Sequence, residues 1–467
     1  MELSGLLFLY AFLPLSLGAY FISRSVKWRN GVLLVFSLLF YAWGDITRLP
    51  LLVLVALINF LAARLISRFP EGRRRSAVLC IAIIFDLALL AVYKYTGFVT
   101  ENINALFGIS LTVPKLLAPL GVSFYTFRLI SYLLDVHWEK TEAEGNFARF
   151  LMYVSLFPCT VSGPIVRYAD VKEQLTDRKS TVKDVADGLC RLACGLAKKV
   201  IIADKLAVFV DELFTANVAD ASVAACWLGA VAFALQVYFD FSGYTDMAIG
   251  LARIFGITFP ENFNYPFLCS TIAEFWQRWH ITLGSFFRDY LLYVPIFGRQ
   301  HKYLALFLVW FSTGIWHGAS WNYIIWGLFF GAFILIETLL GKKRMKKIPL
   351  PVKHIYTKLV LIIGFGIFRF TDTKALLKFL GGLFGLNGNA LIGDTLGHTL
   401  ANNAFLFLAA LICTFPILTR IRERMYRAPI GVITYGAVRI AVCAVLLVIA
   451  SILLVSATTN PFLYANF

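Results

Sequence analysis

Charged residues are scarce in this sequence of 467 residues. Asp, Glu, Lys and Arg make up 15% of it, and hydrophobic residues make up 59%. A soluble globular domain carries roughly 25% charged residues. Apolar stretches of about 17 to 25 residues, long enough to cross a lipid bilayer as helices, recur from one end of the chain to the other. The composition therefore excludes a string of soluble domains and predicts a polytopic membrane protein.

Several common catalytic and ligand-binding motifs are absent as well. The sequence has no G-x-S-x-G nucleophile elbow, no H-E-x-x-H zinc helix, no Walker A loop and no G-x-G-x-x-G loop. None of the six histidines is followed five positions later by an aspartate, so the H-x-x-x-x-D dyad of soluble-type glycerolipid acyltransferases is missing too. The eight cysteines form no C-x-x-C pair. We expect neither a metal site nor a disulfide framework.

The net charge of +16 could indicate a nucleic-acid ligand, but the distribution of the basic residues argues against one. Lys and Arg gather in short segments between apolar stretches, for example at residues 73–75 and 342–347, which is the positive-inside pattern of membrane proteins. Residues 1–22 are apolar and carry Glu2 instead of the basic start of a cleavable signal. We expect them to form a retained helix with the amino terminus outside.

The apolar pattern predicts spanning helices at residues 31–44, 49–65 and 76–93, with every second loop basic. It becomes irregular at residues 119–135 and 157–167, where Pro, Gly and polar residues interrupt apolar sequence. Interrupted helices are tolerated at membrane depth only where protein or water satisfies the freed backbone groups. We therefore expect these two stretches to be broken or re-entrant helices that line a cavity.

A further predicted span, residues 227–255, contains Asp240 and Asp246. Carboxylates at membrane depth are costly unless they face a pocket or pair with a cation, for which Arg253 is a candidate. Before this span, residues 168–183 are polar and are expected to form an aqueous or interfacial connection. An amphipathic stretch from Val185 onward could lie on the inner membrane surface.

Residues 274–326 hold the strongest candidates for chemistry. His317 lies in an otherwise apolar run between Trp316 and the small residues Gly318 and Ala319. A neutral imidazole with a pKa of about 6.5 can accept a hydroxyl proton, so His317 is a candidate general base. The alternative is a neutral histidine that is hydrogen-bonded to a neighbouring helix.

His280 lies in a stretch that is too charged to span a bilayer, among Arg278, Arg288 and Asp289. The Trp and Tyr residues around it are typical of an interfacial or cavity-lining helix. His280 could form the other wall of one pocket with His317, or it could be an interfacial histidine bonded to Asp289 or Glu274. The other four histidines are expected to be ordinary surface residues; they are His137, His301, His354 and His398.

Ordered motifs along most of the chain resemble the membrane-bound O-acyltransferase (MBOAT) family, and most closely its bacterial alginate O-acetyltransferase branch. The matching elements are residues 119–127, Phe157-Pro158 with 162–165 and Arg167, residues 240–246 and 262–267, Phe275-Trp276 with 278–281 and 288–290, residues 316–319, Phe368-Arg369 and Pro461-Phe462. The resemblance implies an all-α integral membrane protein with roughly 11–13 transmembrane or re-entrant helices around a central tunnel. It implies one membrane domain over residues 1–467, with N-terminal helices in 1–94, a catalytic core in 114–370 and C-terminal helices in 400–467.

The resemblance also implies roles. His317 matches the family's catalytic histidine and His280 its second functional histidine. A cytoplasmic thioester, with acetyl-CoA as the expected donor and no bound cofactor, would supply the acyl group. The acceptor would be an extracytoplasmic polysaccharide, reached directly or through an SGNH-type partner outside a bacterial cytoplasmic membrane. Arg278 and Arg288 are candidate contacts to donor phosphates or structural partners of Glu274 and Asp289. The candidate binding set is completed by Asp289, Trp316, Asp240 and Asp246.

Three alternatives stay open from the sequence. The family includes teichoic-acid D-alanyl transferases, whose donor is a carrier-protein thioester. A polysaccharide or lipid transporter would also line its path with polar residues inside the membrane. A structural scaffold for an envelope complex would tolerate replacement of both histidines, whereas an acyltransferase would not.

Overall fold

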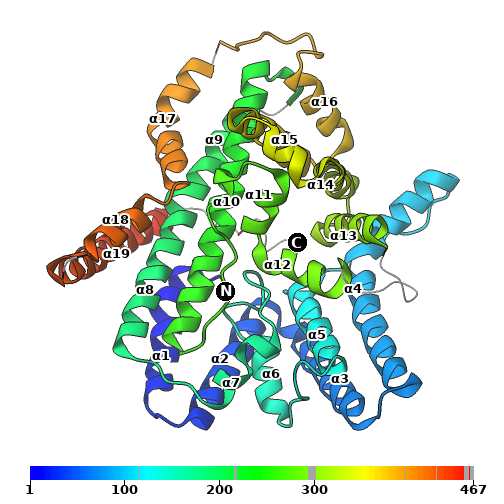
Figure 1. Ribbon diagram of the computed structural model, residues 1–467, viewed down its shortest axis with the longest axis vertical. Coiled ribbons are helices and arrows are strands. Elements are labelled where there is room, and N and C mark those ends of the chain that lie inside the picture. The colour runs from blue at the N-terminus through cyan, green and yellow to red at the C-terminus, as the bar shows by residue number, and fades with distance from the viewer. Residues whose placement is uncertain are drawn as a thin grey trace. The chain divides into compact units, whose positions relative to one another are not determined.

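A computed structural model of the chain describes residues 1–114, 116–214, 218–292, 301–394, 396–427, 429–456 and 462. Within these ranges the regular structure is helical, and extended pairing is limited to an isolated bridge between Phe263 and Trp279. Seven helical segments of this part of the chain are long and apolar enough to cross a membrane (Figure 1). They confirm the predicted all-α, multi-pass membrane class.

The chain divides into two compact units. One comprises Met1–Leu192 and Tyr244–Pro260, and the other comprises Ala193–Gly243 and the described residues from Glu261 onward. The long helix α10, Val223–Ile254, contributes residues to both. Both histidines of interest belong to the second unit.

The first unit is built from helices whose lengths follow the apolar stretches of the sequence. In order they are η1 (Phe8–Phe12), α1 (Leu13–Phe21), α2 (Val26–Asp45), η2 (Ile46–Arg48), α3 (Leu49–Arg68), α4 (Arg73–Phe107), α5 (Val122–His137), α6 (Phe147–Ser155), α7 (Tyr168–Thr176) and most of α8 (Val182–Ala197). Helices α2 and α3 confirm the predicted spans at 31–44 and 49–65. Helix α4 continues well beyond residue 93 and ends at Gly108, whose φ of +64° places it in the left-handed region.

Only one of the two predicted interruptions is a break in a helix. Residues 122–135 of the first stretch belong to the continuous helix α5, because Gly121, with φ +68°, turns the chain before the helix begins. The prediction of a broken helix there is therefore wrong. Residues 156–167 are non-helical and almost entirely buried, as expected for the second stretch. Arg128 on α5 is fully buried and donates hydrogen bonds to the carbonyls of Tyr153 and Val154, which satisfies carbonyl groups near the carboxyl end of α6.

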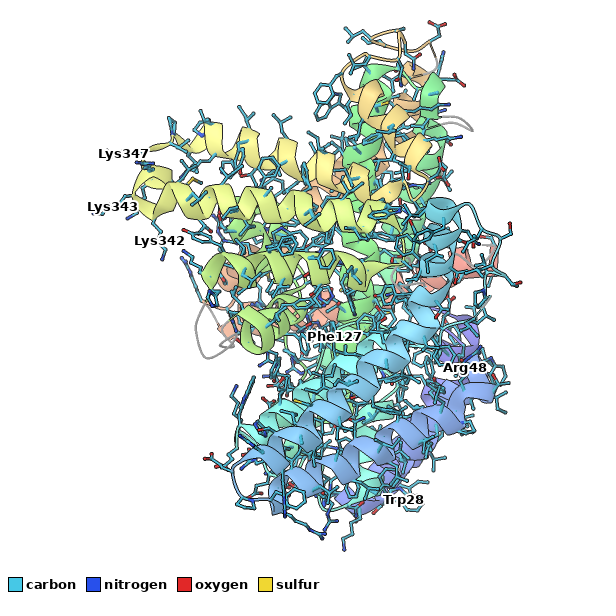
Figure 2. All side chains as sticks on the ribbon, turned by 90° about the vertical axis from the view of Figure 1, so that its right-hand side faces the viewer. Trp28, Arg48, Phe127, Lys342, Lys343 and Lys347 are labelled. Carbon is cyan, nitrogen blue, oxygen red and sulfur yellow. The ribbon has the colours of Figure 1, made fainter. Side chains whose placement is uncertain are left out.

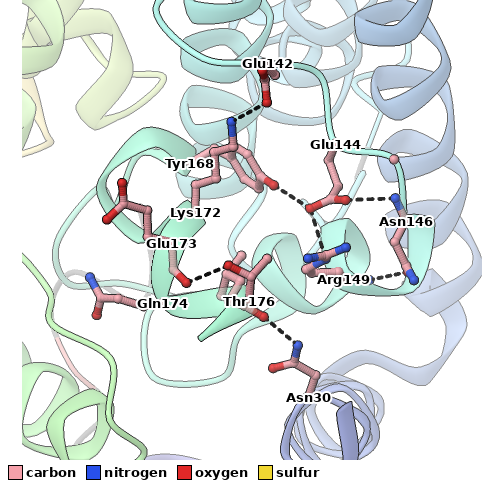
Figure 3. A network of polar contacts seen from close by, with 12 residues as sticks. Asn30, Glu142, Glu144, Asn146, Arg149, Tyr168, Lys172, Glu173, Gln174 and Thr176 are labelled. Carbon is pink, nitrogen blue, oxygen red and sulfur yellow. Dashed lines mark hydrogen bonds and ion pairs between the residues drawn. The ribbon is translucent and has the colours of Figure 1, made fainter. Parts of the chain in front are cut away.

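The polar residues after α6 form a packed network rather than a loose connection (Figure 3). Residues 168–176 of the predicted connection are the helix α7. Glu144 accepts a hydrogen bond from the Tyr168 hydroxyl and forms an ion pair with Arg149 at 3.1 Å. Asn30 on α2 donates to the Leu175 carbonyl on α7 at 2.8 Å. These bonds fasten α7 to α2 and to the residues before α6.

The second unit carries the remaining helices. They are η3 (Lys198–Ala203), α9 (Asp204–Phe214), η4 (Val218–Asp220), the first part of α10, η5 (Pro266–Leu268), α11 (Ile272–Arg278), α12 (Ile281–Phe287), η6 (Arg288–Leu292), α13 (Lys302–His317), α14 (Trp321–Lys347), α15 (Leu350–Arg369), α16 (Thr373–Leu383), α17 (Leu396–Cys413), α18 (Ile417–Met425) and α19 (Pro429–Ser456). Residues 274–290 form two short helices and a turn of π-helix, not a span. This agrees with the prediction drawn from their charge.

Helices α13 and α14 form a tightly packed hairpin that places His317 at its turn. Gly314 and Gly327 face each other's helix, and a Cβ on either would collide with the backbone carbonyl of Tyr323 or Trp310. Small residues at such positions let two helices approach closely. At the far end of α14, Lys342, Lys343 and Lys347 project together (Figure 2). This is the basic segment that the sequence analysis placed on the cytoplasmic side.

Candidate active site

His280 occupies a strained turn between α11 and α12. Its φ of +45° and ψ of +53° are left-handed, a conformation that residues other than glycine seldom adopt. The strand-like segment beside it holds this turn in place, because Asn264 N donates to the Arg278 carbonyl at 2.9 Å and Ile281 N to the Asn262 carbonyl at 3.0 Å. The imidazole is 2% exposed. Strain of this kind persists only where the surroundings impose it, which is common at functional sites.

The side chain of Asn262 determines which imidazole nitrogen of His280 carries hydrogen. Asn262 is fully buried. Its Oδ1 accepts from the backbone N of Thr282 at 3.1 Å and from the Thr282 hydroxyl at 2.9 Å, and it lies 3.1 Å from Nδ1 of His280. The backbone N–H of Thr282 identifies this atom as the oxygen, which can only accept. Nδ1 of His280 must therefore be the donor, and Nε2 carries the lone pair.

Burial lowers the pKa of His280, which lies outside the seven membrane-length helices, to about 3. Desolvation disfavours the charged imidazolium, so His280 is neutral at physiological pH. A neutral imidazole with a defined acceptor nitrogen can receive a hydrogen bond at Nε2. It can do so without first losing a proton of its own.

His317 ends α13 inside a shell of aromatic rings. It is 2% exposed. The ring centroids of Trp326 and Phe368 lie 4.8 and 5.2 Å from its own, and that of Trp316 lies at 4.9 Å. Because α14 supplies Trp326 and α15 supplies Phe368, three consecutive helices enclose the imidazole. The predicted position of His317 in apolar surroundings is thus observed.

Trp316 brings the two histidines into one site. Its ring centroid lies 6.0 Å from that of His280 and 4.9 Å from that of His317. Phe241 on α10 also packs against His280, with ring centroids 4.7 Å apart. Residues far apart in the sequence therefore pack around the two histidines within the second unit.

The arginines near His280 are engaged in ion pairs with neighbouring carboxylates. Arg278 pairs with Glu274 at 2.8 Å, and Arg288 pairs with Asp289 at 2.8 Å. Both are partly exposed. These are the structural pairings considered as the alternative to donor binding. His280 is bonded to Asn262, a residue to which the sequence analysis had not assigned a role.

The two carboxylates of α10 are paired, but not with the predicted partner. Asp240 is buried and lies 2.8 Å from the ammonium of Lys199, which also meets Asp204 at 2.8 Å. Asp246, which belongs to the first unit, pairs with Arg191 at 2.9 Å. Arg253 instead pairs with Asp184 and Asp187. Asp240 thus stands in an ion cluster of the second unit, and the prediction of Arg253 as a partner is wrong.

No three His, Cys, Asp or Glu side chains lie close enough together to hold a metal ion within the described part of the chain. Of the matching motifs, Pro461 lies outside the described residues. Fold and site together define a multi-pass membrane protein with two buried histidines that share an aromatic wall.

Comparison with known proteins identifies the family. Residues 142–359, which contain both histidines, match the family model "MBOAT, membrane-bound O-acyltransferase family". The chain is 38% identical over 393 residues to the probable alginate O-acetylase of Pseudomonas aeruginosa, covering 82% of this chain and 75% of that protein. It is 32% identical over 424 residues to the peptidoglycan O-acetyltransferase of Helicobacter pylori, covering 82% and 80%. A teichoic acid D-alanyltransferase of Bacillus subtilis is 29% identical over 269 residues, covering 54% and 67%.

The chain belongs to the membrane-bound O-acyltransferase family. It is therefore an O-acyltransferase embedded in a membrane. The resemblance noted in the sequence, including its alginate O-acetyltransferase branch, is confirmed.

Proposed function

We propose that this protein transfers an acetyl group from acetyl-CoA on the cytoplasmic side to hydroxyl groups of an extracytoplasmic polysaccharide. The observation that carries the proposal is the pair of buried histidines that both contact the ring of Trp316. The relatives support the group and the acceptor class, because two of them are named as O-acetyl-transferring proteins of alginate and peptidoglycan. The membrane is a bacterial cytoplasmic membrane, and the amino terminus lies outside.

The chemistry requires a base and the exclusion of water. The hydroxyl oxygen of the acceptor attacks the thioester carbonyl carbon while its proton passes to the His317 imidazole. When the carbon–sulfur bond breaks, the thiolate takes up that proton, so the products are an ester and a thiol with no net proton change. His280, with its lone pair on Nε2, positions the donor or relays the proton. The aromatic shell around His317 keeps out the water that would hydrolyse the thioester.

The distribution of charge supports a cytoplasmic donor. Acetyl-CoA is anionic, and the basic segment at Lys342–Lys347 lies at the end of α14 opposite His317. Arg288 stays 54% exposed beside Asp289, and Arg278 stays 33% exposed beside Glu274, so both can contact donor phosphates. A tunnel between the two sides would let an acceptor hydroxyl from outside reach the thioester. That hydroxyl belongs either to the polysaccharide itself or to an SGNH-type partner protein, which then passes the acetyl group to the polysaccharide.

Mass spectrometry of envelope glycans tests this function. Cells carrying His317→Ala should lose ester-linked acetyl groups while the protein keeps its abundance. His398→Ala, which alters an exposed histidine on α17, is the matched control and should leave O-acetylation unchanged. His317→Gln separates an enzyme from a transporter, because a transporter that needs only a hydrogen bond would keep working. Ester-linked D-alanine in place of acetyl would identify the D-alanyl transfer reaction, and unchanged acetyl in His317→Ala would refute the enzyme.

A further inference from the structure

Trp326 on α14 presents a buried hydrogen-bond donor with no acceptor among the described residues. The residue is 3% exposed, and its indole Nε1 is buried without a hydrogen-bond partner. An indole N–H can donate but cannot accept. Leaving a buried donor unsatisfied costs free energy, so most buried polar groups in native proteins are paired and each exception needs an explanation.

The ring that carries this donor packs directly against the candidate general base. The centroids of the Trp326 and His317 rings are 4.8 Å apart and the rings are nearly perpendicular, at 83°. Trp276 on α11 contacts Trp326 with a centroid separation of 5.5 Å, and its Nε1 is also buried without a partner among the described residues. Two adjoining indole donors therefore lie together, one of them on the ring that packs against His317, and neither has an acceptor among the described residues.

The chemistry of acyl transfer supplies the missing acceptor. As the hydroxyl oxygen bonds to the thioester carbonyl carbon, the π electrons of that carbonyl move onto its oxygen, which becomes an oxyanion. When the carbon–sulfur bond breaks, the carbonyl reforms and the thiolate leaves with the proton. Preorganised N–H donors in a dry site stabilise this oxyanion more than the starting carbonyl, and so they accelerate the reaction.

We propose that Trp326 is a catalytic residue whose indole N–H binds the thioester carbonyl oxygen and the oxyanion formed from it, with the Trp276 N–H as the second donor. The inference rests on the proposed function, since it assigns a role within the same acyl transfer. It differs from a packing role in a testable way. A packing role depends on the ring, whereas this role depends on the N–H group.

Trp326→Phe keeps an apolar ring against His317 and Phe368 and removes the donor. Trp310→Phe is the matched control, because Trp310 belongs to the same aromatic cluster, with its ring centroid 5.0 Å from that of Trp276, but is not one of the two proposed donors. The readout is the initial rate of acetyl ester formation in membrane vesicles given labelled acetyl-CoA at several concentrations. Abundance and thermal stability of each variant are measured alongside.

We expect Trp326→Phe to lower kcat by about 10-fold or more, up to about 10²- to 10³-fold, with KM little changed. Trp310→Phe should stay close to wild type. Placing 3-benzothienylalanine at position 326 replaces N–H by sulfur with almost no change of shape, and it should reproduce the loss even if Trp326→Phe folds poorly. Full activity of the benzothienyl variant would overturn the proposal. If His317→Ala also retained activity, the proposed function itself would fail; a loss confined to His317→Ala would refute only the role of Trp326.

Discussion

Asn262 Oδ1 lies 3.1 Å from Nδ1 of His280, and this contact fixes the tautomer of the imidazole. Because the same oxygen also accepts two hydrogen bonds from Thr282, it cannot turn away without leaving buried donors unsatisfied. Asn262 therefore acts through His280 as a positioning residue. It determines which of the two imidazole nitrogens carries the lone pair.

Replacing Asn262 by Leu should lower O-acetyl transfer by about 10- to 100-fold, the usual effect of removing a residue that orients a functional histidine. Asn262→Asp keeps the acceptor and should restore part of the activity relative to Leu. The measurement is the acetyl content of envelope glycans, normalised to protein abundance. Equal activity of the Leu variant and wild type would contradict the positioning role.

The pKa of His280 gives a prediction about acid stability. Its value in the folded protein is about 3, below the usual value of about 6.5, so between these pH values the unfolded chain binds more protons. Stability attributable to this residue is therefore full above pH 6.5 and falls progressively as the pH drops toward 3. His280→Asn should flatten the decrease in Tm between pH 7 and pH 4.5. The exposed control His398→Asn should not, and an identical decrease in all three proteins would refute the prediction.

The ion cluster of Lys199, Asp204 and Asp240 should respond unequally to substitution. Lys199 is 3% exposed and forms an ion pair with each of the two carboxylates. Lys199→Met leaves two carboxylates without their cation and should destabilise the protein by about 3–5 kcal/mol, whereas Asp240→Asn leaves Lys199 paired with Asp204 and should cost less. Combining the two substitutions should recover stability relative to Lys199→Met. Thermal unfolding in detergent measures the order of stability of these variants. A double variant that is less stable than Lys199→Met would contradict the prediction.

Glu337 should matter to the site because it holds α11, the helix that precedes His280. Its two carboxylate oxygens accept from the backbone N–H groups of Ile272 and Ala273 at 2.7 and 2.9 Å, so α14 caps the start of α11. Losing such a cap costs about 0.5–2 kcal/mol. Glu337→Ala should reduce both Tm and O-acetyl transfer, and Glu337→Gln, with one remaining acceptor, should be intermediate. Unchanged transfer in the Ala variant would show that α11 is positioned by its other contacts.

The sequence predicted what local patterns determine. The lengths of apolar stretches indicated α2, α3 and α10, because crossing a bilayer imposes a length on each helix. His280 and His317 were found because an ionisable residue among apolar neighbours is unusual. The break expected inside α5 is not there, because Gly121 turns the chain just before the helix begins. The sequence pattern alone did not show that this turn would precede the helix instead of interrupting it.

Features that depend on tertiary packing were not predictable in this way. Asp246 pairs with Arg191, 55 residues earlier, and not with Arg253 two turns further along the same helix. Asn262 lies in a loop, where a single amide gives no periodic signal. In the sequence, Trp326 is one of many aromatic residues in an apolar helix. Only its position beside His317 in the structure gives it a candidate role.

The central claim is that the acetyl group passes from the cytoplasmic side through the site of His317. Inside-out membrane vesicles expose the cytoplasmic face, so labelled acetyl-CoA added outside should label polysaccharide enclosed in the lumen. We predict lumenal acetyl esters in vesicles with the wild-type protein or His398→Ala, and background labelling with His317→Ala at equal protein abundance. Equal lumenal labelling with His317→Ala and wild type would contradict the account.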